Sequence, residues 1–374
     1  MFLIESIEDV PILSTTLRIM KFWSFLIVHN WRRYVCLTPY ILMNITQFLD
    51  LYYTTEPIVN VIRNAYITVL CFNTILRALL LCLHRYRYEQ FMAKLKNYYV
   101  QLMCMNDTFV NSEIKNTIQA AKVFTRINLL MGILACIGFV TYPIFSTSKV
   151  LPFGVFVPGI NKYRSPYYEI IFILQVIMVP MGCCMNIPYT NLIISFIMFG
   201  ILMCKTLQYK IRNLNFINSS KAKDDLVWCI KYQVKIIRFV DTVNGLTTYI
   251  WLTEFLTYGA MLCVMLFLLL IVQTVGQMII VSAYIITFAA QIIPMYFFAN
   301  ELYVESIAVA TAAYESNWYD SDMDTKKFLK LFMLRAQKPC AILVGNVAHM
   351  NLELLQTLLN TTYSYFTLLK RFYG

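Results

Sequence analysis

The side chains that could carry out catalysis or hold a metal are few and widely separated in this sequence. The three histidines are His29, His84 and His349, and the sequence contains no C-x-x-C pair. Zinc sites and acid–base catalysts need several such groups brought together. Cys183 and Cys184 are adjacent, so on a helix their side chains would diverge. We therefore expect a protein that is not an enzyme, with no catalytic residues, no metal and no cofactor.

Acidic residues are equally sparse in the apolar parts of the chain. Asp50 is the one aspartate near an apolar segment, whereas an intramembrane aspartyl protease would need two that face each other. Glu254 and Glu353 approach apolar segments, but we expect each to lie near a cytosolic end. A proton-coupled transporter would show acidic or histidine groups at mid-membrane. A small-solute transporter therefore stays only as a less favoured alternative.

The composition indicates that lipid surrounds much of the chain. Of the 374 residues, 59% are hydrophobic and 14% are charged, and the mean hydropathy is +0.61. Soluble domains carry about 25% charged residues. The first residues include Glu5, Glu8 and Asp9 instead of a basic stretch, so no signal peptide is predicted. The long apolar stretches predict an all-α polytopic membrane protein, because lipid-exposed backbone must satisfy its hydrogen bonds internally.

Hydropathy and the gaps between charges predict seven membrane-spanning helices. The run Gly245–Ala299 contains one charge, Glu254, and is too long for a single crossing of a core about 30 Å thick. We expect two helices there, with Gly276 as the breaker. Pro180 and Pro188 are expected to kink the fourth span. The predicted spans are Val35–Tyr53, Ala65–Leu83, Ile127–Phe145, Ile170–Cys204, Leu246–Val272, Gln277–Ala299 and Asn346–Leu369.

The distribution of Lys and Arg predicts the orientation. With a cytosolic amino terminus, the inside segments 1–36, 85–126, 205–253 and 300–339 hold 24 of the 31 basic residues, and the outside segments hold 6. Cytosolic loops are enriched in Lys and Arg. Seven spans then place the carboxyl terminus outside, the reverse of G-protein-coupled receptors. The net charge of +11 is thus a signal of topology, and no nucleic-acid partner is predicted.

The carboxyl-terminal third differs from an ordinary helical bundle. Pro294–Tyr319 continues the sixth span into the cytosol, and Lys326–Ala348 has the pattern of an amphipathic cytosolic helix that leads into the last span. In that span, Thr357, Thr361 and Ser364 share one helix face with apolar residues that follow them. Such a stripe suits a wetted pathway with an apolar constriction. Hydrogen bonding between helices is an equally good interpretation.

The spans also contain aromatic side chains with sparse polar groups between them. Phe139 and Tyr142 lie in the third span, and Phe172 and Gln175 lie in the fourth. This mixture suits a small, largely apolar ligand that a few polar contacts orient. The alternative interpretation is ordinary helix–helix packing by aromatic residues.

Three motifs follow one another near the carboxyl terminus. They are N-E-L…E-S…A-x-x-x-x-Y-x-x-x-W-Y at Asn300–Tyr319, R-A-Q-K-P at Arg335–Pro339 and S-Y-F-T-L-L at Ser364–Leu369. Together they resemble the motifs of the insect odorant receptor family. Span number, orientation and loop lengths extend the resemblance over essentially the whole chain. Our main alternative is the related gustatory receptor family, whose chains end with T-Y followed six residues later by Q-F. In this chain Thr362–Tyr363 is followed by Leu369–Lys370 at that position, so the odorant receptor family fits better.

The resemblance implies a ligand-tuning subunit of a tetrameric, odorant-gated, nonselective cation channel. The family's co-receptor is longer, with a large insertion in the second cytosolic loop, and loop 205–245 of this chain is short. The implied partners are a small volatile odorant, co-receptor subunits in a heterotetramer and membrane lipid, with no G protein required. The implied location is the plasma membrane of the dendrite of an olfactory sensory neuron.

The resemblance also gives the expected domain organisation, in which a ligand-binding bundle, an anchor and a pore helix follow one another. A cytosolic segment would cover residues 1–34, and spans one to four would form the ligand-binding bundle at 35–204. The remaining parts would be the cytosolic loop and anchor helices 205–245, spans five and six at 246–299, the cytosolic anchor region 300–345 and the pore-lining span 346–374.

The family's odorant pocket lies in the outer half of the second, third, fourth and sixth spans, and its gate lies near the outer end of the last helix. Helical facing selects the individual pocket residues on this chain, and loop Thr147–Pro166 is expected to cover the site. The predicted odorant-binding residues are Tyr66, Leu70, Asn73, Phe139, Tyr142, Phe172, Gln175, Val176, Val179, Met278, Ser282 and Tyr284. The predicted pore and gate residues are Thr361, Ser364, Leu368 and Phe372.

Overall fold

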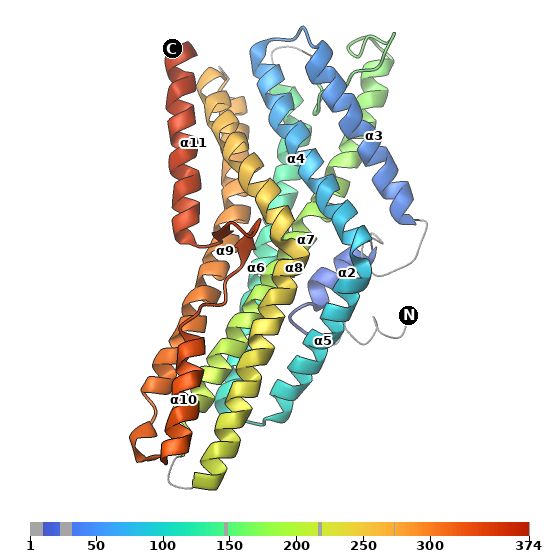
Figure 1. Ribbon diagram of the computed structural model, residues 1–374. Helices are drawn as coiled ribbons and strands as arrows, with labels where there is room; N and C mark the ends of the chain where they lie inside the picture. The colour runs from blue at the N-terminus through green and yellow to red at the C-terminus, as the bar shows by residue number, and fades with distance from the viewer. Residues whose placement is uncertain (1–9, 23–31, 146–148, 216–218, 273, 374) are drawn as a thin grey trace.

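A computed structural model describes residues 10–22, 32–145, 149–215, 219–272 and 274–373. Long helices dominate it, and α6 to α9 run alongside one another from the end that holds α10 towards the end that holds the carboxyl terminus (Figure 1). The elements are α2 (Ser14–Phe22), α3 (Arg32–Tyr53), α4 (Ile58–Leu83), α5 (Arg85–Cys104), α6 (Thr108–Thr141), η1 (Tyr142–Phe145), α7 (Tyr167–Arg212), α8 (Ser219–Ile271), α9 (Val275–Tyr314), η2 (Trp318–Asp320), α10 (Met323–Ala336), β1 (Leu343–Val344), β2 (Ala348–His349) and α11 (Leu352–Tyr373).

Polar caps and proline define where several of these helices begin. The Asp107 side chain accepts a hydrogen bond from the Phe109 N–H at the start of α6, and Thr274 accepts one from the Gln277 N–H at the start of α9. Pro57 immediately precedes α4. Such caps satisfy backbone donors that have no partner within the helix.

The predicted all-α architecture with seven spanning helices is confirmed. By length and composition alone, the helices that qualify as membrane-spanning among the described residues are α4, α6, α7, α8 and α9. The first and last predicted spans form α3 and α11, which carry more polar residues. Both are 22 residues long, enough to cross a hydrocarbon core of about 30 Å.

The sixth span, α9, continues as a helix to Tyr314, as the sequence predicted, and the spans before it are extended as well. At the same end of the molecule, α7 continues to Arg212 and α8 begins at Ser219. The α7 helix runs through Pro180 and Pro188 without ending. Neighbouring helices bury its second half almost completely, which stabilises the helix through burial of apolar side chains.

Two predicted boundaries are wrong. Gly276 is not the breaker between α8 and α9, because it lies inside the first turn of α9, after the Thr274 cap. Lys326–Ala348 is not one helix: α10 ends at Ala336, and the chain then forms the antiparallel β1–β2 hairpin. Asn346, the predicted start of the last span, lies in the hairpin turn with a positive φ of 58°. The last helix therefore begins later, at Leu352.

The hairpin attaches the start of α11 to α8. The Asn244 side chain of α8 donates to the Ala341 carbonyl and accepts from the Leu343 N–H, both at 2.9 Å. The Gly345 N–H donates to the Thr248 carbonyl at 3.0 Å. These backbone groups would otherwise be unpaired at a helix–hairpin junction, so α8 fixes the position from which α11 starts.

The amino-terminal segment is partly integrated into the fold. In α2 the side chains of Leu17 and Met20 are buried, and the helix packs against α7. The sequence pattern had indicated only a cytosolic segment over residues 1–34. Residues 1–9 and 23–31 of it lie outside the described residues.

Candidate ligand cavity and pore helix

A cavity lies among α3, α4, α6, α7, α8 and α9. About 780 Å³ of space lies between its side chains, part of which is open to the surroundings. Its walls are mostly apolar. The lining residues are Tyr40, Tyr66, Ile67, Leu70, Cys71, Thr74, Gly132, Ala135, Phe139, Phe153, Val179, Gly182, Cys183, Asn186, Ile187, Met261, Met265, Tyr284, Thr287, Phe288 and Gln291.

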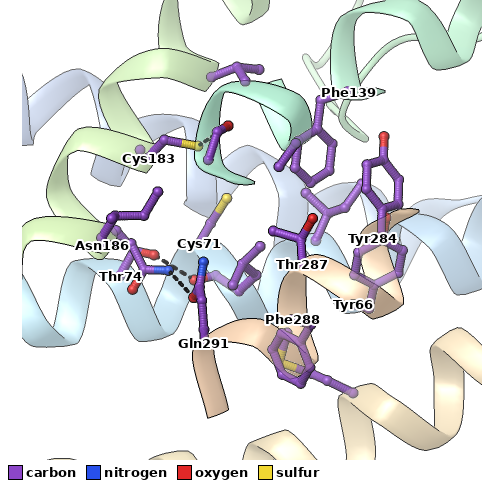
Figure 2. Close-up of a pocket in the computed structure, with 18 of the residues that line it drawn as sticks. Tyr66, Cys71, Thr74, Phe139, Cys183, Asn186, Tyr284, Thr287, Phe288 and Gln291 are labelled. Atoms are coloured by element: carbon purple, nitrogen blue, oxygen red, sulfur yellow. Dashed lines mark hydrogen bonds between the residues drawn. The ribbon is translucent and has the colours of Figure 1, made fainter. Parts of the chain in front are cut away.

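Aromatic rings line one side of the cavity (Figure 2). Phe139 stacks on Tyr284 with ring centroids 4.6 Å apart, and Tyr66 lies 6.2 Å from Tyr284. The hydroxyls of Tyr66 and Tyr284 are buried and have no hydrogen-bond partner among the described residues. A buried hydroxyl without a partner is unfavourable, so both are available to a polar atom of a ligand.

Amide and hydroxyl groups gather on the opposite side, where Asn186, Gln291 and Thr74 lie close together in Figure 2. The Asn186 amide donates to Gln291 Oε1 at 3.5 Å. The hydroxyl of Tyr40 donates to Cys71 Sγ at 3.3 Å. The cavity thus combines apolar surface with a few oriented polar groups, which is the composition of a site for a small, mainly apolar molecule.

The loop between η1 and α7 covers the outer end of the cavity. Phe153 of this loop lines the cavity, and the Gln175 side chain holds its backbone with two hydrogen bonds. The Phe156 N–H donates to the Thr46 carbonyl of α3 at 3.2 Å. The described part of the loop, from Lys149 onward, therefore contributes Phe153 to the cavity wall and is held against α3 and α7.

Charged groups tie the same loop to α3 and to the turn that precedes α4. Lys162 lies 2.5 Å from both Asp50 Oδ1 and Glu56 Oε1, and the Tyr163 hydroxyl donates to Glu56 at 2.6 Å. Burial alone would raise the pKa of Glu56, but Lys162 and Tyr163 hold it below its ordinary value. The carboxylate stays charged at neutral pH, so it keeps its bond to the loop.

Among the described residues, helix α11 contacts the rest of the chain through one face. Leu358 and Thr362 are buried against α8, where the Thr362 hydroxyl lies 3.4 Å from the Gly259 carbonyl. The opposite face, which carries Thr361, Ser364 and Leu368, is exposed. Figure 1 shows α11 standing at the side of the bundle. A hydroxyl-bearing helix face in an apolar chain is thus available for contacts outside this chain.

Comparison with known proteins assigns this fold. Residues 58–363, most of the chain, match the family described as 7tm Odorant receptor. The chain belongs to the insect odorant receptor family. The receptor is 52% identical to odorant receptor 30a of Drosophila melanogaster over 368 residues, which cover 98% of each chain. It is 40% identical to odorant receptor 10 of Aedes albopictus over 99% of this chain and 100% of that protein.

The fold is also that of a solved olfactory receptor. The receptor superposes on OR5 of Machilis hrabei, solved in complex with eugenol, with a TM-score of 0.81. The match covers 98% of this chain and 97% of that one at 17% sequence identity. The receptor is therefore a multi-pass helical membrane protein.

The structure brings five of the twelve predicted odorant-binding residues to the cavity wall. They are Tyr66, Leu70, Phe139, Val179 and Tyr284. All five lie on the helices that the sequence analysis selected, so the choice of elements agrees with the position of the cavity.

The other seven predicted residues do not line the cavity. Gln175 does not line the cavity itself, but its side chain forms two hydrogen bonds with the backbone of the lining residue Phe153. The Asn73 amide donates to the Thr257 hydroxyl at 2.7 Å, and Phe172 stacks on Tyr168 with centroids 6.1 Å apart. The remaining four also lie away from the lining: Tyr142 is buried beneath the Arg63 guanidinium, Val176 and Ser282 are half-buried, and Met278 is exposed.

The cavity lies farther from the outer helix ends than the sequence analysis placed it. On α7 it is lined between Val179 and Ile187, and on α9 between Tyr284 and Gln291. Loop residues fill the space nearer the outer surface. The polar lining residues Asn186 and Gln291 were missed, although an amide within a long apolar run is a signal that could have found them.

The predicted pore and gate residues lie on α11. Thr361, Ser364 and Leu368 share its exposed face, as helical spacing predicted. Phe372 lies within the helix, but its side chain is outside the described part of the structure.

Proposed function

We propose that the receptor is a ligand-tuning subunit of an odorant-gated, nonselective cation channel. The exposed polar face of α11 carries this proposal. In the described part of the chain, Thr361 and Ser364 point away from α8, and their hydroxyls donate to α11 carbonyls one turn earlier, those of Thr357 and Asn360. Hydroxyl groups that face hydrocarbon find no polar partner there. Hydroxyl groups that face a central axis line a hydrated path.

A second part of the proposal is that a small volatile binds in the cavity that α4, α6, α7 and α9 line. The similar receptor of Machilis hrabei was solved with eugenol, a small aromatic compound. In this chain, the unpaired hydroxyls of Tyr66 and Tyr284 would orient a ligand that carries one hydrogen-bonding group. Phe139 would supply stacking area for a ring.

A single chain offers one α11 helix, so a pore requires several subunits around an axis. We propose a heterotetramer with co-receptor subunits in the plasma membrane of an olfactory sensory dendrite, with membrane lipid around it and no G protein. Ligand binding then opens the channel only if the open state binds the ligand more tightly than the closed state.

Electrical recording tests this function directly. A panel of phenols, indoles, terpenoids and esters should evoke cation current in cells that express the receptor together with the co-receptor. Cells that express the receptor alone should give none. Current without the co-receptor would instead support a gustatory-type channel, and uptake without current would support a transporter.

A further inference from the structure

A buried ion pair lies at the inner end of the ligand cavity. Arg77 of α4 and Glu254 of α8 bond to each other, and each side chain is only 3% exposed. Removing two charges from water is costly unless further polar contacts compensate. Arg77 also donates to the Tyr258 hydroxyl at 2.6 Å, to the Thr190 hydroxyl at 2.9 Å and to the Asn186 side-chain oxygen. Polar groups within spanning segments are expensive, which makes this cluster a candidate for a functional role.

The cluster touches the wall of the ligand cavity at three points. Asn186, which lines the cavity, accepts the hydrogen bond from Arg77. Phe288, another lining residue, meets the Tyr258 ring edge-on with centroids 5.0 Å apart. Gln291 lines both the ligand cavity and a second cavity beside the ion pair. Figure 2 shows Asn186, Phe288 and Gln291 at the wall. A ligand that moves these side chains acts directly on the partners of Arg77 and Tyr258.

The second cavity leads from the ion pair to the start of the pore helix. It is narrow, and Arg77, Glu254 and Tyr258 line it together with Met350. Met350 ends the hairpin segment, and its N–H donates to the Ile342 carbonyl at 2.8 Å. The hairpin sets where α11 begins, so the same small space borders both the ion pair and the base of α11.

Helix α8 makes the second connection. Tyr258 points to Arg77, while the next residue, Gly259, contacts Leu358 of α11 and accepts from Thr362. Consecutive residues on a helix face about 100° apart, so one rigid turn presents one side to the ion pair and another to the pore helix. Because packed elements shift as units, a rotation of this turn would move both contacts.

We propose that Arg77, Glu254 and Tyr258 are positioning residues that transmit occupancy of the ligand cavity to α11, with the Tyr258 hydroxyl as the bridge. This proposal rests on the proposed channel function. The three residues would then couple the ligand cavity to the pore helix, in addition to stabilising the packing of α4 against α8. Coupling of this kind is a free energy that links ligand binding to the state of the pore.

The mildest test variant is Tyr258→Phe, which removes the bridging hydroxyl and keeps the ring against Phe288. Glu254→Gln is the stronger variant, because it leaves the Arg77 charge buried without a partner. Thr257→Val is the matched control: Thr257 also joins α8 to α4, through Asn73, but lines neither cavity. Each variant is expressed with the co-receptor and challenged with eugenol, phenol and indole. Current, surface level and ligand-induced thermal stabilisation of the purified receptor are measured.

We expect Tyr258→Phe to lower the maximal evoked current roughly tenfold, a change of about 1.4 kcal/mol in the gating equilibrium. Its surface level and its stabilisation by the volatile should stay close to the wild-type values. Thr257→Val should match the wild type in all three measurements. If Glu254→Gln does not reach the surface, Tyr258→Phe alone decides the test.

Three outcomes would overturn the proposal. Wild-type current from both Tyr258→Phe and Glu254→Gln would show that the ion pair only supports the fold. An equal loss of current and of ligand-induced stabilisation would place these residues in ligand binding instead of coupling. A wild-type receptor that gives no current with any member of the phenol, indole, terpenoid and ester panel would refute the channel function itself, and the coupling proposal with it.

Discussion

The side-chain amide of Gln175 forms two hydrogen bonds with the backbone of one loop residue, Phe153. Its oxygen accepts from the Phe153 N–H at 3.0 Å, and its nitrogen donates to the Phe153 carbonyl at 3.1 Å. The pair fixes the ring of Phe153 as a cover over the cavity. Gln175 therefore influences the ligand site without touching it.

Replacing Gln175 with Leu should loosen this cover. Each lost hydrogen bond contributes about 1 kcal/mol net, so the half-maximal concentration of an activating volatile should rise roughly three- to thirtyfold. Dose–response curves recorded with the co-receptor measure the shift. Ile177→Ala is the control, because Ile177 lies two residues further on the same helix and is 61% exposed. Equal curves for the two variants would contradict a role for the cover.

Truncation of the aromatic wall should weaken ligand binding. Phe139→Ala removes apolar surface that contributes about 25 cal/mol per Å², so a loss of about 1–2 kcal/mol in affinity is expected. Phe172→Ala is the matched comparison, because Phe172 packs on Tyr168 outside the cavity lining. Ligand-induced thermal stabilisation of the two purified variants should decrease only for Phe139→Ala. A larger loss for Phe172→Ala would place the ligand nearer the outer surface.

A polar residue at Leu368 should make the channel leak. Narrow apolar constrictions close by dewetting, so Leu368→Gln should raise ligand-independent current when expressed with the co-receptor. Leu369 is the control position, because it is half-buried and faces about 100° away from Leu368, which is 51% exposed. At matched surface levels, the same leak from Leu369→Gln would argue against this register of the gate.

The orientation can be tested with epitope tags at both ends of the chain. The bias of 24 basic residues inside to 6 outside predicts a cytosolic amino terminus. A tag before Met1 should stain only permeabilised cells, and a tag after Gly374 should stain intact cells. Staining of intact cells through the amino-terminal tag would reverse the assignment of inside and outside.

The start of α10 should respond to pH through Asp322. Its bonds to Lys223 and to Thr325 lower the pKa of this carboxyl to about 2. Since the folded pKa lies below the ordinary value of about 3.9, the stabilisation is present at neutral pH and is lost as the pH falls towards 2. The protection of the first α10 amides against hydrogen exchange, corrected for the intrinsic pH dependence of exchange, should decrease over this range. Asp322→Asn should keep the cap but show a weaker pH dependence, and an unchanged profile would exclude the ion pair as the cause.

The sequence determined where the helices of this protein lie in the chain better than it determined which face of each helix points to which neighbour. Apolar length alone located the spans, and the excess of basic residues in alternate loops gave an orientation. The hydroxyl stripe of α11 was also readable, because this helix has polar residues on one face and apolar residues on the other. Helix α11 therefore shows periodicity, and its exposed residues Thr361, Ser364 and Leu368 are those that spacing predicted.

Only the tertiary structure decided which side chains meet. Helices α7 and α9 are apolar on every face, so periodicity could not distinguish the face towards the cavity from the face towards neighbouring helices or lipid. Asn73 consequently pairs with Thr257 instead of lining the site. The pairing of Arg77 with Glu254 joins residues 177 positions apart in the chain. A local sequence pattern cannot predict this pairing, because the two side chains meet only when α4 and α8 pack side by side.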